Sequence, residues 1–278
     1  MTAPIVKADG WLALRRLTPA RIALGRSGAS VPTAAQLAFQ LDHARARDAV
    51  HAALDAGELA RALMPPLSPT YASLPATAPL HVHSAARDRL QYLQRPDLGR
   101  RLDADSRAAL DASRPAGGAD LVIVIADGLS ALAVARHAPP FVQALDALLA
   151  RRHAGEAPWR VAPLVIAQQA RVALGDDVAE RLHARAVLVL IGERPGLSSP
   201  DSMGLYLSWA PRVGMRDAER NCISNVRPAG LAVEAAAARL VYLLGQARLL
   251  GMSGVALKDE SNIGGGTTTA AIGPAGNG

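Results

Sequence analysis

Apolar runs alternate with helix-like segments throughout the second half of the chain, and this order constrains the fold more than any other feature. The runs 121–126, 161–167 and 187–191 are continuous and apolar, as strands buried on both faces are. Helical spacing follows them, and the expected helices are 131–137 resuming as 141–152, then 176–184 and 233–250. Further short strands are expected at 205–209 and 254–257. This alternation predicts an α/β fold with a mostly parallel, Rossmann-like, doubly wound sheet.

The first 115 residues have a different character. Apolar positions three and four apart predict a helix over 33–54, with shorter helices at 11–17, 87–93 and 104–113. Prolines make 64–80 an irregular connection, and the turn residues of 115–118 mark a boundary. We therefore expect a smaller, mainly helical N-terminal region (1–115) that docks a partner, and a sheet domain (116–260). The tail, 261–278, has no core-forming pattern and is expected to be disordered.

Composition excludes several classes of protein. The formal net charge is +6, but the 30 basic residues include only Lys7 and Lys258 as lysines, and the arginines are dispersed among acids and apolar residues rather than gathered in a patch for nucleic acid. A single cysteine excludes an internal disulfide framework. No apolar stretch is long enough for a signal peptide or a membrane span. The expectation is a soluble, cytoplasmic protein.

The turn Asp127-Gly128-Leu129-Ser130 follows the first strand of the expected sheet. It places a carboxylate and a possible N-cap serine at a helix start, either as an anion site or as ordinary capping. The chain has no Gly-x-Gly-x-x-Gly fingerprint, no Walker-type loop and no Gly-x-Ser-x-Gly elbow. His81-x-His83 lacks a nearby third ligand. We assign no catalytic residue and no metal site.

Two polar positions stand apart from this background. Glu193 follows the apolar strand 187–191, where a carboxylate is costly unless it is paired. It either forms a salt bridge with Arg194, Arg212 or Arg216, or accepts hydrogen bonds from a ligand that carries amides. Cys222, the only cysteine, lacks a histidine nearby in sequence, which favours a packing or contact role over nucleophilic catalysis.

Several long motifs resemble the small (light) subunit of ethanolamine ammonia-lyase, an enzyme that depends on adenosylcobalamin. The similar stretches run in order along the chain and begin at Thr18 (TPARIALGR), Phe39 (FQLDHARARDAVH), Tyr92 (YLQRPDLGR), Ile125 (IADGLS), Gly192 (GERPGL) and Cys222 (CISN). They cover the chain from about residue 11 to residue 258.

The resemblance implies a large, TIM-barrel partner subunit and an assembly of six heterodimers that converts ethanolamine to acetaldehyde and ammonia by a radical route. It implies that the cofactor supplies the hard chemistry and that this chain, inactive alone, clamps the corrinoid against the large subunit. It also implies a cytoplasmic location, with a bacterial microcompartment as the compartment to be tested. The alternative is a corrinoid-binding or assembly module without catalytic duty.

Carried over motif by motif, the resemblance implies cobalamin contacts at Val172, Glu193 and Cys222, all expected in loops or after strands. The Asp-x-His-x-x-Gly motif, through which a histidine replaces the cofactor's own base on cobalt, does not occur in the chain. The resemblance therefore implies that the cofactor binds base-on. For partner contact, the candidates are the Arg-rich loop 21–26 and the helix 33–54.

Overall fold

The computed structural model describes residues 6–7, 9–63, 78–151 and 157–261. Its helices are η1 (Leu12–Arg16), α1 (Thr33–His51), α2 (Ala56–Leu63), α4 (Arg89–Gln94), η2 (Leu98–Arg100), α5 (Ala104–Ala112), α6 (Ala131–Ala150), α7 (Leu174–Arg181), η3 (Asp217–Glu219) and α8 (Val233–Leu250). Its strands are β1 (Leu80–His83), β2 (Ala119–Ala126), β3 (Val165–Gln168), β4 (Ala184–Gly192), β5 (Met203–Trp209) and β6 (Asn221–Val226). The expected tail lies almost wholly outside the described residues, as does most of the proline-rich connection.

The strands form one mixed sheet in the order β1-β3-β2-β4-β5-β6. Pairing is parallel from β1 to β4, whereas β5 is antiparallel to both of its neighbours. The α/β class is confirmed, but the mostly parallel, Rossmann-like sheet is a wrong prediction. The reason is the short connection between β4 and β5, residues 193–202, which turns the chain back on itself. A parallel return would need a crossover of a dozen residues or more.

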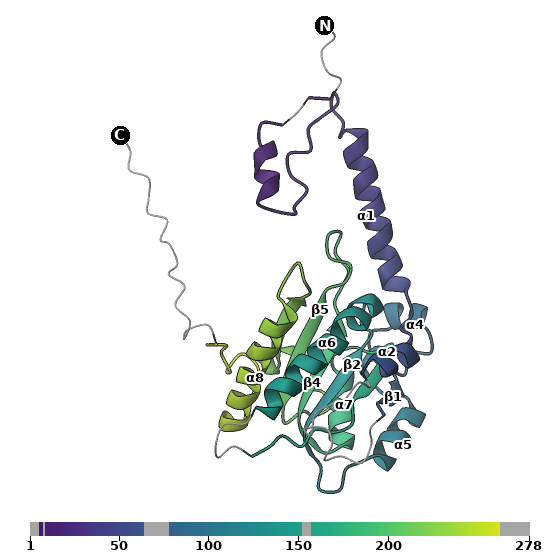
Figure 1. Ribbon diagram of the computed structural model, residues 1–278. Helices are drawn as coiled ribbons and strands as arrows, with labels where there is room; N and C mark the ends of the chain where they lie inside the picture. The colour runs from purple at the N-terminus through teal and green to yellow at the C-terminus, as the bar shows by residue number, and fades with distance from the viewer. Residues whose placement is uncertain (1–5, 8, 64–77, 152–156, 262–278) are drawn as a thin grey trace, which may run out of the picture.

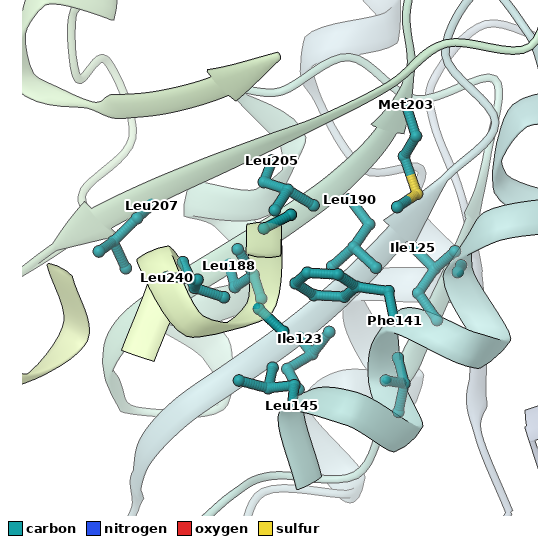
Figure 2. Packing of buried hydrophobic residues seen from close by; sticks show 14 of the residues in the cluster. Ile123, Ile125, Phe141, Leu145, Leu188, Leu190, Met203, Leu205, Leu207 and Leu240 are labelled. Atoms are coloured by element: carbon teal, nitrogen blue, oxygen red, sulfur yellow. The ribbon is translucent and has the colours of Figure 1, made fainter. Parts of the chain in front are cut away.

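Helices cover the two faces of the sheet unequally. On one face, α6 and α8 pack together over β2, β4, β5 and β6, and Figure 2 shows Phe141 among the leucines and isoleucines of this layer. On the other face, α5 and α7 cover the valines of β2 and β4. That second cluster has no member from β6 and only Tyr206 from β5. The antiparallel extension therefore has one face without a helix over it among the described residues.

Tertiary packing overrides some local signals. Pro139 and Pro140 were expected to interrupt a helix, yet α6 runs through them. The two prolines remove two backbone donors, but Phe141, Val142 and Leu145, which follow them in the helix, are buried in the core over the sheet and stabilise it. The strand expected at 254–257 is absent. The structure instead has an edge strand that was not predicted, β6, in a run of polar residues that was expected to be a loop.

The first part of the N-terminal region is one projecting helix, α1, with the segment before it, whereas β1 of the same region belongs to the sheet and α2 and α5 pack against α6 and α7. Figure 1 shows α1 leaving the body of the molecule, with the segment before it folded back beside the far end of the helix. Within α1 only Ala46 and Ala49 are buried, while Leu37 and Leu41 are 60% and 51% exposed. Arg21, in the Arg-rich loop 21–26, pairs with Asp42 of α1 at 2.5 Å. No helix of the described residues is long and apolar enough to cross a bilayer.

Candidate functional site

A hollow of about 430 Å³ opens at the edge of the sheet where the parallel strands end. Its lining comes from α4, the β2–α6 turn, the β3–α7 loop, the end of β4 and strand β5, namely Tyr92, Gly128, Leu129, Arg171, Val172, Ile191, Gly192, Glu193, Arg194 and Tyr206. Ligands of open α/β sheets bind at this edge, because the strand ends bring polar loops together there. Two of the three predicted cofactor contacts, Val172 and Glu193, therefore share one hollow.

Two glycines allow the strand ends to approach each other below this hollow. Gly128 has a φ of +55°, and a Cβ atom there would lie 2.3 Å from the Gly192 carbonyl oxygen. A Cβ atom on Gly192 would lie 2.0 Å from the Ser130 carbonyl oxygen. Side chains at either position would push β2 and β4 apart. The turn Asp127–Ser130 also caps α6 as expected, since the Ser130 hydroxyl accepts from the Ala133 amide at 3.2 Å.

Glu193 is held by hydrogen bonds rather than by a salt bridge. Its Oε2 atom accepts a hydrogen bond from the Ser202 hydroxyl and another, at 3.3 Å, from the Asn225 amide. Among the described residues, Oε1 accepts no hydrogen bond, and it lies over Gly204, where a Cβ atom would be 2.8 Å away. Among the described residues, Glu193 forms no ion pair with Arg194, Arg212 or Arg216, and the last two pair with Glu219 instead. One carboxylate oxygen is thus fixed and the other is available to a ligand.

Val172 lies in the loop between β3 and α7, beside a stacked group of cations and an aromatic ring. Arg89 and Arg171 both lie over the Tyr92 ring, each with its guanidinium carbon 4.8 Å from the centroid. The Tyr92 hydroxyl donates to the Ala170 carbonyl at 3.2 Å. Burial, with the nearby charge of Asp127, raises the pKa of Tyr92 to about 12, so the phenol remains a donor. This stack gives the loop a rigid backing.

Cys222 was expected in a loop and is instead on strand β6, which corrects that prediction. It is exposed and lies opposite Tyr206 in the antiparallel register, so both side chains are on the face without a covering helix. Desolvation and the charge of Glu193 raise the pKa of the Cys222 thiol. Cys222 is not one of the residues that line the hollow, but its neighbour Tyr206 is. All three predicted contacts are therefore on one side of the sheet.

A buried ion pair underlies this part of the site. Arg220, the residue before β6, donates from both Nη atoms to Asp176 of α7, each at 2.7 Å. The same guanidinium donates to the Ser208 hydroxyl and the Met215 carbonyl, both at 2.9 Å. The side chains are 1% and 0% exposed. The pair joins α7, β5 and the start of β6, and so sets where Cys222 and Tyr206 lie relative to the loop that carries Val172.

Sequence reasoning identified the strand ends but missed several residues of the hollow. Tyr92, Arg171 and Tyr206 were not singled out, although Tyr92 begins one of the motifs that carry the resemblance. Their roles depend on contacts between segments far apart in the chain. His81 and His83 lie on β1, and His83 Nδ1 contacts the Ser84 carbonyl at 2.7 Å. Across the described ranges, no group of three metal-ligating side chains comes together.

The chain is similar over most of its length to proteins of one family. The family model described as ethanolamine ammonia-lyase light chain (EutC) matches residues 8–258. A relative from Pseudomonas putida KT2440 is 56% identical over 91% of this chain and 89% of its own length. A relative from Ralstonia nicotianae GMI1000 is 54% identical over 94% and 93%, respectively. Both are named ethanolamine ammonia-lyase small subunit. The chain belongs to the ethanolamine ammonia-lyase light-chain family.

Proposed function

We propose that this chain, as the small subunit of an ethanolamine ammonia-lyase, holds adenosylcobalamin against a large catalytic subunit. The observation that carries the proposal is the hollow at the carboxyl edge of the sheet, which unites Val172 and Glu193 and lies beside Cys222. The relatives from Pseudomonas and Ralstonia are both named ethanolamine ammonia-lyase small subunit, and each is similar to this chain over nearly its whole length. Ammonia release from ethanolamine is the reaction that the proposal assigns to the complex.

The residues of the hollow suit a macrocycle edged with amides. Glu193 offers one uncommitted carboxylate oxygen on a fixed side chain, and a charged acceptor makes strong hydrogen bonds to amide donors. Val172 offers an apolar contact beside it. A hollow of about 430 Å³ admits an edge of the corrin, so the remaining contacts fall to the partner.

The work of the residues in this chain is binding, orientation and exclusion of water. When bound, adenosylcobalamin supplies the radical chemistry through homolysis of its cobalt–carbon bond. Glu193 would accept a hydrogen bond from an amide of the macrocycle and so limit its rotation, while Val172 and Cys222 would pack against it. Substrate binding and hydrogen abstraction are assigned to the large subunit, so this chain by itself should be inactive.

Reconstitution tests the function directly. Purified large subunit and adenosylcobalamin are assayed for ammonia release from ethanolamine, with and without this chain. The proposal expects turnover only with both chains. Equal turnover by the large subunit alone would contradict it. Cobalamin binding without any contribution to turnover would favour the alternative, a corrinoid-binding or assembly module.

Glu193→Ala tests the binding role. Loss of a hydrogen bond to a charged acceptor in a partly dry site costs about 1–3 kcal/mol, which weakens cofactor binding roughly 5- to 150-fold. Glu234→Ala is the matched control, because Glu234 is an exposed carboxylate in the first turn of α8, on the opposite face of the sheet. Absorbance titration of the reconstituted complex measures both. Equal affinities in the two variants would refute the role of Glu193.

The N-terminal region is proposed to dock on the large subunit. The support is the projecting helix α1, whose apolar Leu37 and Leu41 are exposed, and the 81% exposed Leu17 before it. Leu37→Asp with Leu41→Asp should abolish co-purification with the large subunit, whereas Leu249→Asp, at the equally exposed end of α8, should not. We also propose that six heterodimers form one assembly, which native mass measurement tests. A location inside a microcompartment in the cell is part of the same proposal.

A further inference from the structure

Asp127 is a buried carboxylate at the end of β2 that holds the loop carrying Val172. It is 3% exposed. Its Oδ2 atom accepts from the Gln169 amide at 2.9 Å, and its Oδ1 atom accepts from the Ala170 amide at 3.0 Å. Gln169 has a φ of +52°, a left-handed conformation that a side chain bearing Cβ rarely adopts without support. The two hydrogen bonds supply that support at the start of the β3–α7 loop.

Arg89 joins the same loop to two other parts of the molecule. Its Nε donates to the Val50 carbonyl at the end of α1 at 2.6 Å, and its Nη1 donates to the Gly128 carbonyl at 2.8 Å. Nη1 also lies 3.4 Å from Gln169 Oε1 and 3.6 Å from Asp127 Oδ2. The side chain is 14% exposed. One guanidinium thus connects the projecting helix with the turn after β2 and the loop after β3.

These contacts converge on the lining of the hollow. Gly128 and Val172 belong to that lining, and each is in or next to a segment that Asp127 or Arg89 holds. The loop is also anchored on its far side, since the Arg171 amide donates to the Gly99 carbonyl at 2.8 Å. Burial raises the pKa of Asp127, while the two amides and Arg89 act in the opposite direction. Neither Asp127 nor Arg89 lines the hollow itself.

We infer that Asp127 and Arg89 are positioning residues, which hold the Gly128 turn and the Val172 loop in the conformation that receives the cofactor and tie that conformation to α1. The inference rests on the proposed function. A positioning role differs from a general role in stability, because a buried carboxylate with similar contacts at the other end of β2 would have no effect on the hollow. The chain contains such a carboxylate, which allows the two roles to be compared.

Asp120 is the matched control. It lies at the opposite end of β2 and accepts from the Arg160 amide at 3.0 Å and from the Arg160 guanidinium at 3.4 Å. Asp127→Asn and Arg89→Met are compared with Asp120→Asn and Arg160→Met, each assembled with the large subunit. Adenosylcobalamin is titrated by absorbance, kcat is measured at saturating cofactor, and amide hydrogen exchange is followed at Gln169 and Ala170.

The first pair should weaken adenosylcobalamin binding about tenfold or more, with kcat at saturation little changed and faster exchange at both amides. Substitution of residues that orient the direct ligands of a bound metal weakens its binding about 10- to 100-fold, and an effect of similar size is expected here. The second pair should lower thermal stability and leave affinity and exchange at those amides unchanged. Arg89→Lys keeps the charge but cannot reach Val50, Gly128 and Gln169 together. If Asp127→Asn does not fold, Arg89→Lys tests the inference in its place.

Unchanged affinity in folded Asp127→Asn or Arg89→Lys complexes overturns the inference and leaves the proposed function intact. Equal losses of affinity in both pairs also overturn it, because the effect would then be one of stability. A wild-type complex that binds no adenosylcobalamin contradicts the proposed function, and the inference with it.

Discussion

Removing the guanidinium of the buried Arg220–Asp176 pair should lower the free energy of unfolding of this chain by a large fraction. Arg220→Met deletes hydrogen bonds to Asp176, Ser208 and Met215. It leaves the carboxyl of Asp176, which is 0% exposed, without its partner charge. Breaking a buried pair in this way costs about 3–5 kcal/mol, a large share of the roughly 5–15 kcal/mol that stabilises a folded protein.

The magnitude predicts a measurable thermal shift. For a chain of this size, each kcal/mol lowers Tm by about 2–4 °C, so Arg220→Met should lower it by roughly 6–20 °C. Burial already raises the pKa of Asp176, and loss of Arg220 raises it further. A carboxyl whose pKa is raised in the folded state stabilises the protein at pH values below its unfolded-state pKa. That stabilisation is lost as the pH rises through the folded-state pKa. The defect should therefore be smaller under acidic conditions than at neutral pH.

A double-substitution cycle separates pairing from packing. Replacing both partners with apolar residues, Arg220→Met with Asp176→Leu, removes the unpaired charge and should recover much of the loss, because apolar replacement of buried pairs is often neutral. Unfolding in urea, followed by circular dichroism, gives the four free energies. A single variant as stable as the wild type, or a double variant as unstable as the sum of the singles, would refute the reasoning.

Three further predictions concern charge, backbone and the thiol. Burial opposes ionisation of Asp120, but hydrogen bonds from Arg160 outweigh it and lower the pKa, so Asp120→Asn should be less stable at pH 7, and the difference should fade in urea titrations as the pH drops below the ordinary value of 3.8. Gly128→Ala should lower stability by more than about 1 kcal/mol in thermal unfolding, whereas Gly245→Ala, in open space on α8, should raise it. Because its pKa is raised, Cys222 should react slowly with a maleimide at pH 7 and faster as the pH rises; a rate independent of pH would contradict this.

The interior of the sheet could be predicted from local sequence. The runs 121–126 and 187–191 fall within β2 and β4, and 233–250 is α8. Long apolar or periodic segments carry their own signal, because burial on both faces leaves no polar position. Strand β6 could not be found in this way. Only Ile223 and Val226 are buried in it, and its other side chains face outward or lie at the edge.

Residue chemistry and strand ends together pointed to Glu193 and Asp127, since a carboxylate after a buried strand needs a partner. The identity of that partner depends on the tertiary structure. Ser202 and Asn225 hold Glu193, and the amides of Gln169 and Ala170 hold Asp127. These partners are 9 to 43 residues away in the chain, so no local pattern encodes them.

The amino-acid order alone determined the strand–helix alternation, the exclusion of several kinds of site and the likeness to one family, because these depend on neighbours in the chain. Tertiary structure decided the reversal of β5, the uncovered face that presents Cys222 and the hollow that joins Val172 to Glu193. Each of these arises from contacts across the sheet, where the direction of a strand and the closeness of two glycines depend on what the rest of the molecule packs against them.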